Sequence, residues 1–309
     1  MTLFFSIGVC MKLLVVSFLI FLPVFSFAKP NLDTEKIEQL TGLKGKFDEA
    51  ENTFKVSNPR KDVKVTVEGW SMPPFMGLTS WAGFTTGKKT SFMVMGDLVL
   101  FQDEVNPVMS TLFENGIAVT ALHNHFFYDD PKVFFMHISA EGNIEKLAAG
   151  IRKAFDTVKE LRAKNPMPAK SFGGQLPPEK SAITAQVIED ILGIKGDSND
   201  GMFKAVIGRK AKLSCGCDVG KDMGINTWAA FAGADDNAFV DGDFAVLESE
   251  LQPVLRALRE NKINIVAIHH HMTEEKPRIL FLHYWGHGKT QDLANGIKAA
   301  LEKQKGIKK

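Results

Sequence analysis

The sequence lacks an excess of charge of either sign. Its 309 residues carry 37 lysines and arginines against 36 aspartates and glutamates, a formal net charge of +1. A nucleic-acid-binding surface normally needs a concentration of basic residues, so the composition gives no support to a nucleic-acid partner. A Gly-rich phosphate-binding loop and a G-x-S-x-G nucleophile motif are also missing, so no nucleotide-binding or serine-hydrolase motif offers a starting point.

Long apolar runs are scarce, and the one that bears on sorting lies at the N-terminus. The basic residue Lys12 precedes an apolar run over residues 13–27 that ends in the small-x-small pattern Ser26-Phe27-Ala28. This order is typical of a secretory signal peptide, and a run of about 15 residues is short for a membrane span, which needs roughly 20. We predict a signal peptide over residues 1–28, with Met11 as a candidate start, and a periplasmic or secreted protein without a further membrane span. An uncleaved membrane anchor is the alternative.

Cysteine is nearly absent. Of three cysteines, Cys10 lies before the charged start of the signal and is not interpreted as a lipidation site. Cys215 and Cys217 remain in the exported part, where disulfides are permitted. A bridge between residues two apart is geometrically unfavourable. We expect two small side chains on one face of a strand, with metal binding or redox chemistry as the alternatives.

Histidine is the scarce residue whose distribution says most. All eight histidines lie in two segments, three in residues 120–142 and five in residues 265–288. These segments belong to an internal repeat. Residues 117–154 align with residues 263–300 without a gap, and thirteen of the 38 aligned positions are identical. A repeat of this length indicates two copies of one structural unit.

The two copies are separated by residues 163–179, whose proline, glycine and lysine content is typical of a linker. We therefore predict domains over residues 31–162 and 180–306. Each copy opens with a short helix, capped in the first copy by Asp33 or Thr34, and continues through strand-like runs. A helix with an apolar stripe, two strands and a last helix follow.

This order of strand, helix, strand, strand and helix is that of a split β-α-β unit. We predict an α+β fold built as a tandem duplication of a split β-α-β (ferredoxin-like) unit. Its sheet is expected to be mostly antiparallel, with helices on one face.

The histidine spacing predicts that their side chains meet. Because side chains alternate along a strand, His123 and His125 share one face. In a hairpin centred on Pro131, His137 falls opposite His125, and the second copy repeats this arrangement, with His270 facing away. One further residue of the returning strand shares the same face. The predicted metal ligands are His123, His125, His137 and Glu141 in the first copy and His269, His271, His283 and His287 in the second.

Three imidazoles with a fourth ligand suit a transition metal such as zinc, copper, nickel or iron. Repeated acids are candidates to accept hydrogen bonds from the N–H groups of the ligand histidines, although helix capping is the stronger expectation for the two glutamates. These acids are Asp97, Glu104, Asp243 and Glu250. The matching Trp81 and Trp228 are expected in the core, with the wall of a pocket as the alternative. The histidines could instead be structural aromatics copied by duplication, and the clusters could form two sites or one joint site.

Several motifs recur in order in both copies. "GLTSWAGF", "TALHNHF" and "PKVFFMHISAEG" in the first copy, with "GINTWAAF", "VAIHHHM" and "PRILFLHYWGHG" in the second, resemble the LppY/LpqO-type family of exported bacterial proteins, a domain of unknown function. The resemblance covers essentially the mature chain. It implies export and names no reaction. Some relatives are lipoproteins, and this chain departs from them because no lipobox cysteine follows its apolar run.

Three functions follow from these patterns. The first is an exported protein that binds a transition metal through a histidine cluster in each repeat. The second is a periplasmic metal-dependent hydrolase, or one that uses a histidine as general base. The third is a metal-free ligand-binding or envelope-interaction module. A deep pocket beside only one cluster, with a carboxylate in reach, favours catalysis, and two equivalent shallow sites favour binding.

Overall fold

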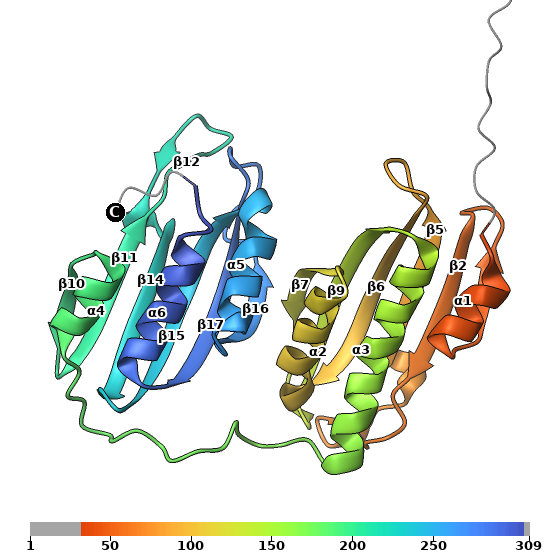
Figure 1. Cartoon of the computed structure of the whole chain (residues 1–309), viewed down its shortest axis with the longest axis horizontal. Coiled ribbons are helices and arrows are strands. Elements are labelled where there is room, and N and C mark those ends of the chain that lie inside the picture. Colours follow the sequence, from red (N-terminus) through yellow and green to blue (C-terminus); the bar gives the residue numbers. More distant parts are fainter. Residues whose placement is uncertain (1–31, 306–309) are drawn as a thin grey trace, which may run out of the picture. The chain divides into compact units, whose positions relative to one another are not determined.

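The structure, a computed structural model, describes residues 32–305, so the predicted signal peptide lies outside the described residues (Figure 1). The first repeat comprises α1 (Thr34–Thr41), β1 (Gly45–Asp48), β2 (Thr53–Pro59), β3 (Thr66–Val67), β4 (Trp70–Ser71), the 3-10 helix η1 (Pro74–Met76), β5 (Thr79–Thr86), β6 (Phe92–Phe101), α2 (Gln102–Glu114), β7 (Ala118–His123), β8 (Asp129–Asp130), β9 (Val133–Gly142) and α3 (Ile144–Lys164).

The second repeat follows the same plan. It comprises α4 (Ala185–Leu192), β10 (Gly196–Asn199), β11 (Met202–Gly208), β12 (Ala211–Lys212), β13 (Asp218–Val219), the 3-10 helix η2 (Lys221–Met223), β14 (Asn226–Ala234), β15 (Asn237–Leu247), α5 (Glu248–Glu260), β16 (Asn264–His269), β17 (Ile279–Gly288) and α6 (Thr290–Leu301).

The main sheet has twelve strands in the order β1-β2-β5-β6-β9-β7-β16-β17-β15-β14-β11-β10. Its second half is the reverse of its first, because the two copies join through their equivalent edge strands β7 and β16. Neighbouring strands pair antiparallel, and β9 lies between β6 and β7. The predictions of an α+β class, a mostly antiparallel sheet and a repeated unit are therefore confirmed.

The two repeats meet at β7 and β16, where Leu122 pairs with Ile268. On each side of this pairing, a side-chain amide binds the backbone of the other repeat twice. Asn106 of α2 donates to Ile265 O at 3.1 Å and accepts from Ile265 N at 2.7 Å. Gln252 of α5, at the equivalent position, donates to Val119 O at 2.7 Å and accepts from Val119 N at 3.2 Å. We call these paired bonds the amide clasps.

Each repeat buries apolar side chains on both faces of its sheet. Helices cover one face (Figure 1), and strand residues such as Leu98 and Leu100 face them as part of the large core. The alternate residues point to the opposite face, where the segment with β3, β4 and η1 covers Val99 and Phe101 in the first repeat. In the second repeat, a smaller core under β12 and β13 includes Phe281.

The predicted cap of the first helix was correct, whereas one predicted strand was too long. Asp33 caps α1 as expected, accepting a hydrogen bond from Lys36 N at 3.0 Å. The alternating run over residues 62–67 predicts a strand, but only Thr66–Val67 pairs. Among the helices of residues 32–305, none combines the length and the apolar character that crossing a bilayer requires.

Candidate metal centre

Three strands of the second repeat bring an aspartate and three histidines together on the face opposite the helices. Asp243 of β15 pairs with His283 of β17, and His283 pairs with Ala267 of β16. His269 ends β16, and His271 lies in the loop that follows. The rings of His269 and His283 are stacked with centroids 4.8 Å apart. We call these four residues the second-repeat cluster.

The expected hairpin register was wrong, although the histidines still meet. His269 pairs with Phe281, and His283 pairs with Ala267 rather than His271. The pairing of His269 with Phe281 centres the hairpin on Glu275, two residues before the proline on which the prediction centred it. The histidines therefore converge as diagonal neighbours and across a loop.

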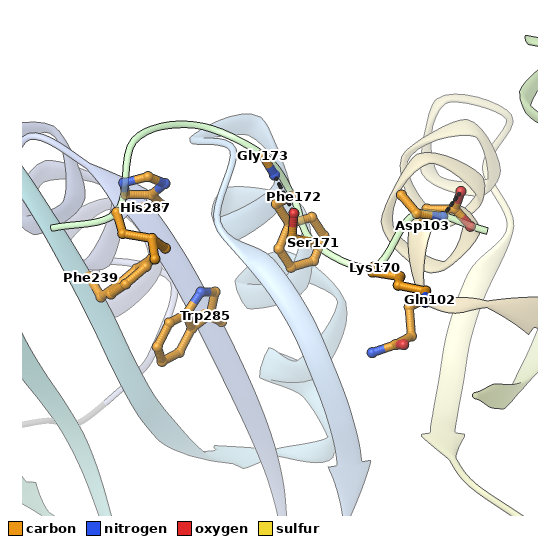
Figure 2. Close-up of a pocket in the computed structure, with 11 residues that line it drawn as sticks. Gln102, Asp103, Lys170, Ser171, Phe172, Gly173, Phe239, Trp285 and His287 are labelled. Carbon is orange, nitrogen blue, oxygen red and sulfur yellow. Dashed lines mark hydrogen bonds between the residues drawn. The ribbon is translucent and has the colours of Figure 1, made fainter. Parts of the chain in front are cut away.

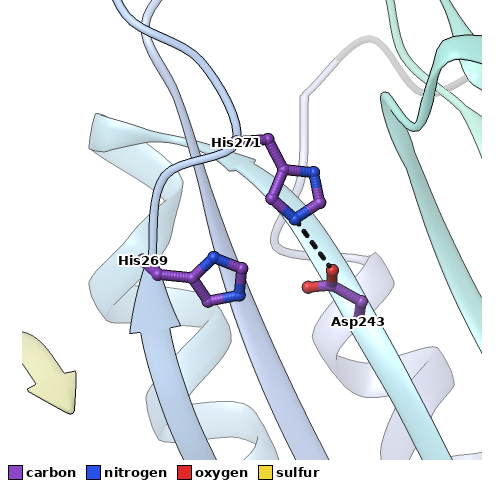
Figure 3. A group of neighbouring side chains, drawn as sticks. All are labelled: Asp243, His269 and His271. Carbon is purple, nitrogen blue, oxygen red and sulfur yellow. Dashed lines mark ion pairs between the residues drawn. The ribbon is translucent and has the colours of Figure 1, made fainter. Parts of the chain in front are cut away.

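The ligand atoms of Asp243, His269 and His271 all lie within 4.8 Å of one another. Figure 3 shows both imidazoles turned toward the carboxylate, with His271 Nε2 at 3.7 Å from Asp243 Oδ2. That separation is too long for a hydrogen bond. Asp243 is 3% exposed, so water does little to solvate its charge.

Two polar atoms in this group are buried without a partner. Asp243 Oδ1 and His269 Nε2 make no hydrogen bond. His269 Nδ1 lies 3.4 Å from the carbonyl oxygen of His270, which can only accept, so this ring nitrogen carries the proton. Nε2 is then the nitrogen with the free lone pair, directed at the aspartate. A buried carboxylate oxygen beside a lone pair is unfavourable unless a proton or cation lies between them.

The protonation states favour ligation at neutral pH. Burial raises the pKa of Asp243 to about 6, and the attraction of His269 opposes that rise. Burial lowers the pKa of His271, repulsion from His269 adds to this, and a hydrogen bond with the Gly224 backbone opposes it. At pH 7 Asp243 is therefore mostly ionised and His271 neutral, the forms that bind metal.

The first repeat places the equivalent residues Asp97, His123, His125 and His137 together as well. Its detail differs, because His123 Nε2 and His137 Nε2 are hydrogen-bonded at 2.9 Å. Asp97 pairs with His137 across the strands, and its Oδ1 is buried without a partner. His125 stacks on Phe135 with centroids 3.4 Å apart, as His271 does on Phe281. We call these four residues the first-repeat cluster.

The structure does not bring Glu141 or His287 into either cluster. Each lies four residues beyond the strand histidine, roughly 13 Å away at about 3.3 Å per residue. Glu141 pairs with Met93 and is exposed. His287 Nε2 lies 2.7 Å from Asn237 Oδ1. The carboxylates that lie beside the histidines are those of Asp97 and Asp243. The sequence predicted these two residues as hydrogen-bond acceptors for the histidines and not as metal ligands.

The repeated glutamates act on their helices rather than on histidines. Glu104 accepts from Phe101 N at 2.8 Å and from Arg60 Nη1 at 2.6 Å. Glu250 accepts from Leu247 N at 3.0 Å and from Arg209 Nη1 at 2.5 Å. Capping was the stronger expectation, and their buried arginine partners had no sequence signal.

The expectation that Trp81 and Trp228 lie in the core was wrong. Both are half-buried, on the face of the sheet opposite the helices. They pair across the strands with Asp97 and Asp243. Lysine ammonium groups lie 4.3 Å and 4.2 Å from their ring centroids, so each tryptophan presents a cation–π face beside a cluster.

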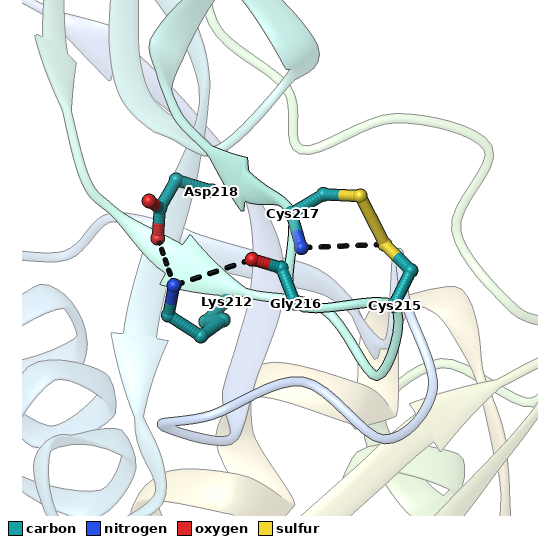
Figure 4. The surroundings of a disulfide bond; sticks show 5 residues. All are labelled: Lys212, Cys215, Gly216, Cys217 and Asp218. Atoms are coloured by element: carbon teal, nitrogen blue, oxygen red, sulfur yellow. Dashed lines mark hydrogen bonds and ion pairs between the residues drawn. A yellow bond between two sulfur atoms is a disulfide. The ribbon is translucent and has the colours of Figure 1, made fainter.

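Cys215 and Cys217 lie in the turn between β12 and β13 and form a disulfide (Figure 4). The expectation of two cysteines on a strand was therefore wrong. Lys212 Nζ lies 2.9 Å from Asp218 Oδ1 and 3.2 Å from Gly216 O in the same turn. The disulfide closes a hairpin that covers the apolar residues next to the second-repeat cluster.

Comparison with known proteins identifies the repeat. A family model described as Domain of Unknown Function (DUF1259) matches residues 35–157 and again residues 186–303. The two matches cover most of the chain and coincide with its two copies. No curated protein matches the chain. No solved structure matches it either.

Proposed function

The chain belongs to the family described as Domain of Unknown Function (DUF1259), and we propose that it binds a divalent transition metal ion through Asp243, His269 and His271. One observation carries the proposal: the buried Asp243 Oδ1 and His269 Nε2 face a shared space without hydrogen-bond partners. A cation there would compensate the charge of the carboxylate and accept the lone pair of the imidazole.

The donor set argues for a transition metal. Two imidazole nitrogens and one carboxylate oxygen suit zinc, copper, nickel or iron, whereas magnesium and calcium prefer oxygen ligands. His283, stacked on His269 and paired with Asp243, is the proposed fourth ligand. The carbonyl of His270 fixes the tautomer of His269, and in metal sites the ligand histidines commonly donate their other ring N–H to such an acceptor.

We propose that the first-repeat cluster binds the same kind of ion more weakly. Its donors are equivalent, but the hydrogen bond between His123 and His137 must break before both nitrogens can ligate. No equivalent hydrogen bond joins His269 and His283 among the described contacts of the second repeat. The two sites therefore differ in affinity although their residues match.

Titration with zinc in competition with a chelator tests the proposal. We expect one tight site per chain, weakened at least about a hundredfold in His271→Ala. His270→Ala is the matched control, because His270 is an exposed neighbour outside the cluster. Equal affinity in both variants, or unchanged metal binding with only a loss of stability, supports a metal-free module instead.

A second candidate function, a metal-dependent hydrolase, is favoured by an asymmetry between the repeats. A cavity of about 430 Å³ adjoins the second-repeat cluster, and its lining includes His283 and the carboxylate of Asp241. A metal ion lowers the pKa of bound water, and a nearby carboxylate can accept its proton. Zinc-dependent hydrolysis of an aryl ester, lost in His271→Ala and reduced in Asp241→Asn, is the expected result. Hydrolysis independent of zinc would exclude it.

We also propose export to the periplasm or beyond, and membership of the LppY/LpqO-type group. The N-terminal order of basic residue, apolar run and small-residue pattern supports export, and the motifs repeated in both copies support the membership. Fractionation of cells expressing the full chain, with mass spectrometry of the mature N-terminus, tests this. Cleavage after Ala28 is expected, and a cytoplasmic full-length chain contradicts it.

A further inference from the structure

Two adjoining cavities lie where the second repeat meets α2 of the first repeat. The larger, of about 430 Å³, is bounded by His283, and the smaller, of about 240 Å³, is bounded by His287. Both share Gln102, Phe172 and Trp285 as walls. Together they form a continuous groove, which we call the aromatic groove, running from beside the second-repeat cluster toward the end of β17.

The linker forms a strap across one end of this groove. Ala169 N donates to Asp103 Oδ2 at 3.0 Å, and Asn237 Nδ2 donates to Gln175 O at 3.0 Å, so the strap is fastened at both ends. Gly174 packs against His287, where an added Cβ would lie only 3.1 Å from Cε1. Figure 2 shows Ser171, Phe172 and Gly173 on the strap, opposite the strand residues of the smaller cavity.

The strand side of the groove is aromatic. Phe239 lies with its centroid 4.7 Å from that of Trp285 and 4.7 Å from that of His287. His287 Nε2 faces the side-chain oxygen of Asn237, so it donates its proton and the ring is fixed in place. His287 is therefore a wall of the groove, not a member of the cluster.

The larger cavity favours an uncharged, planar body. Its lining holds four aromatic rings, including the imidazole of His283, with one carboxylate and no lysine or arginine. Its volume falls in the range of small-molecule sites, about 300–1,000 Å³. At the positions of Phe239, Trp285 and His287 the first repeat carries Met93, Ser139 and Glu141, so the duplication did not require these aromatic residues.

We infer that the aromatic groove binds the planar apolar body of a small organic ligand, whose oxygen-donor head ligates the metal ion at Asp243. The inference rests on the proposed metal site for the head, and on the groove alone for the body. Trp285 supplies the stacking face, and Phe172 closes over it from the strap. The first repeat, without these aromatic residues, binds metal without the organic ligand.

Three probes test the head and the body separately. 2-Naphthohydroxamic acid carries both, acetohydroxamic acid carries the head alone, and 2-naphthamide carries the body alone. Binding is measured by calorimetry to zinc-loaded protein and, for 2-naphthamide, to metal-free protein as well. The variants are Trp285→Ala and Phe172→Ala, with Trp70→Ala, an exposed tryptophan of the first repeat, as the matched control. Phe172 is 62% exposed, so its loss leaves the fold intact.

The zinc-loaded protein is expected to bind the naphthyl hydroxamate about tenfold more tightly than acetohydroxamic acid. Trp285→Ala should abolish that difference, Phe172→Ala should reduce it, and Trp70→Ala should leave it unchanged. Equal binding of the two hydroxamates to the wild-type protein overturns the inference. If zinc does not bind, 2-naphthamide binding that is lost in Trp285→Ala still supports the groove while overturning the proposed metal function. Absence of 2-naphthamide binding overturns the groove.

Discussion

Asp243 Oδ2 lies 3.7 Å from His271 Nε2, and no hydrogen bond closes that gap. The second carboxylate oxygen is buried without a partner, as is Nε2 of His269. A folded protein rarely leaves two such atoms facing each other unless a further group compensates them. A metal ion at this point explains the convergence, the burial and the fixed tautomer together, and each has a measurable consequence.

Metal affinity should fall as the pH is lowered through 6. Asp243 has a pKa of about 6, so protons compete with metal for its carboxylate below that value. Between pH 7.5 and pH 5 this group alone should weaken binding about tenfold, and protonation of imidazole adds to the loss. Zinc titrations across this range measure the effect. An affinity that does not change between pH 7.5 and pH 5 would show that Asp243 is not a ligand.

Asp243→Asn should stabilise the metal-free protein at neutral pH. The pKa of Asp243 is about 6 when folded and near 3.8 when unfolded, so ionisation opposes folding above pH 6. The penalty at pH 7.5 is about 3 kcal/mol, at 1.36 kcal/mol per pKa unit. It shrinks as the pH falls through 6 and disappears below about 4.

Urea unfolding of the metal-free wild-type and variant proteins at pH 7.5 and pH 4 measures this difference. Asp197→Asn is the control, because Asp197 is exposed on β10 at the far edge of the sheet, away from Asp243. A variant no more stable than the wild type at pH 7.5 would mean that Asp243 bears no unfavourable charge.

Both amide clasps should contribute to stability. Asn106→Ala leaves the buried N–H and C=O of Ile265 without partners, and Gln252→Ala does the same to Val119. Each substitution should cost about 1–3 kcal/mol in the free energy of unfolding. Gln39→Ala, on the exposed side of α1, is a matched deletion that should cost little. A loss no larger than that of Gln39→Ala would show that the clasps do not hold the repeats together.

Replacing the buried glutamate should destabilise the first repeat more than the second. Glu104 is fully buried against Arg60 and Arg162, whereas Glu250 is paired with Arg209 alone. Glu104→Ala removes the carboxylate that two buried arginines share, although Arg60 keeps Asp62 and Arg162 keeps Asp103 as partners, and should cost about 3–5 kcal/mol. Glu250→Ala should cost less. Thermal unfolding of both variants ranks them, and a larger effect at Glu250 contradicts this account.

The sequence predicted most of what local chemistry determines. The cap at Asp33, the repeat and the antiparallel class followed from residue order and apolar periodicity. The register of the histidine hairpins did not, because the pairing of His123 with Phe135 centres the first hairpin on Asp129, and no turn motif in the long loop fixes that centre. Asp243 was placed too far from the histidines because its position depends on β15 pairing with β17, strands 32 or more residues apart.

His287 shows the same limit. Counting alternate residues put it on the face of His283, which is correct, but the distance along the strand separates it from the cluster. Its partners, Asn237 and Phe239, lie on a different strand, and Gly174 comes from the linker. Such contacts between distant segments follow only from the folded chain.

The most direct test of the metal site is the metal content of protein purified without an affinity tag, loaded with zinc and dialysed, measured for the wild type and for Asp243→Asn. The account predicts about one retained equivalent per wild-type chain and less than about a tenth in the variant. Less than about a tenth of an equivalent in the wild type, or equal retention by the two proteins, would contradict it.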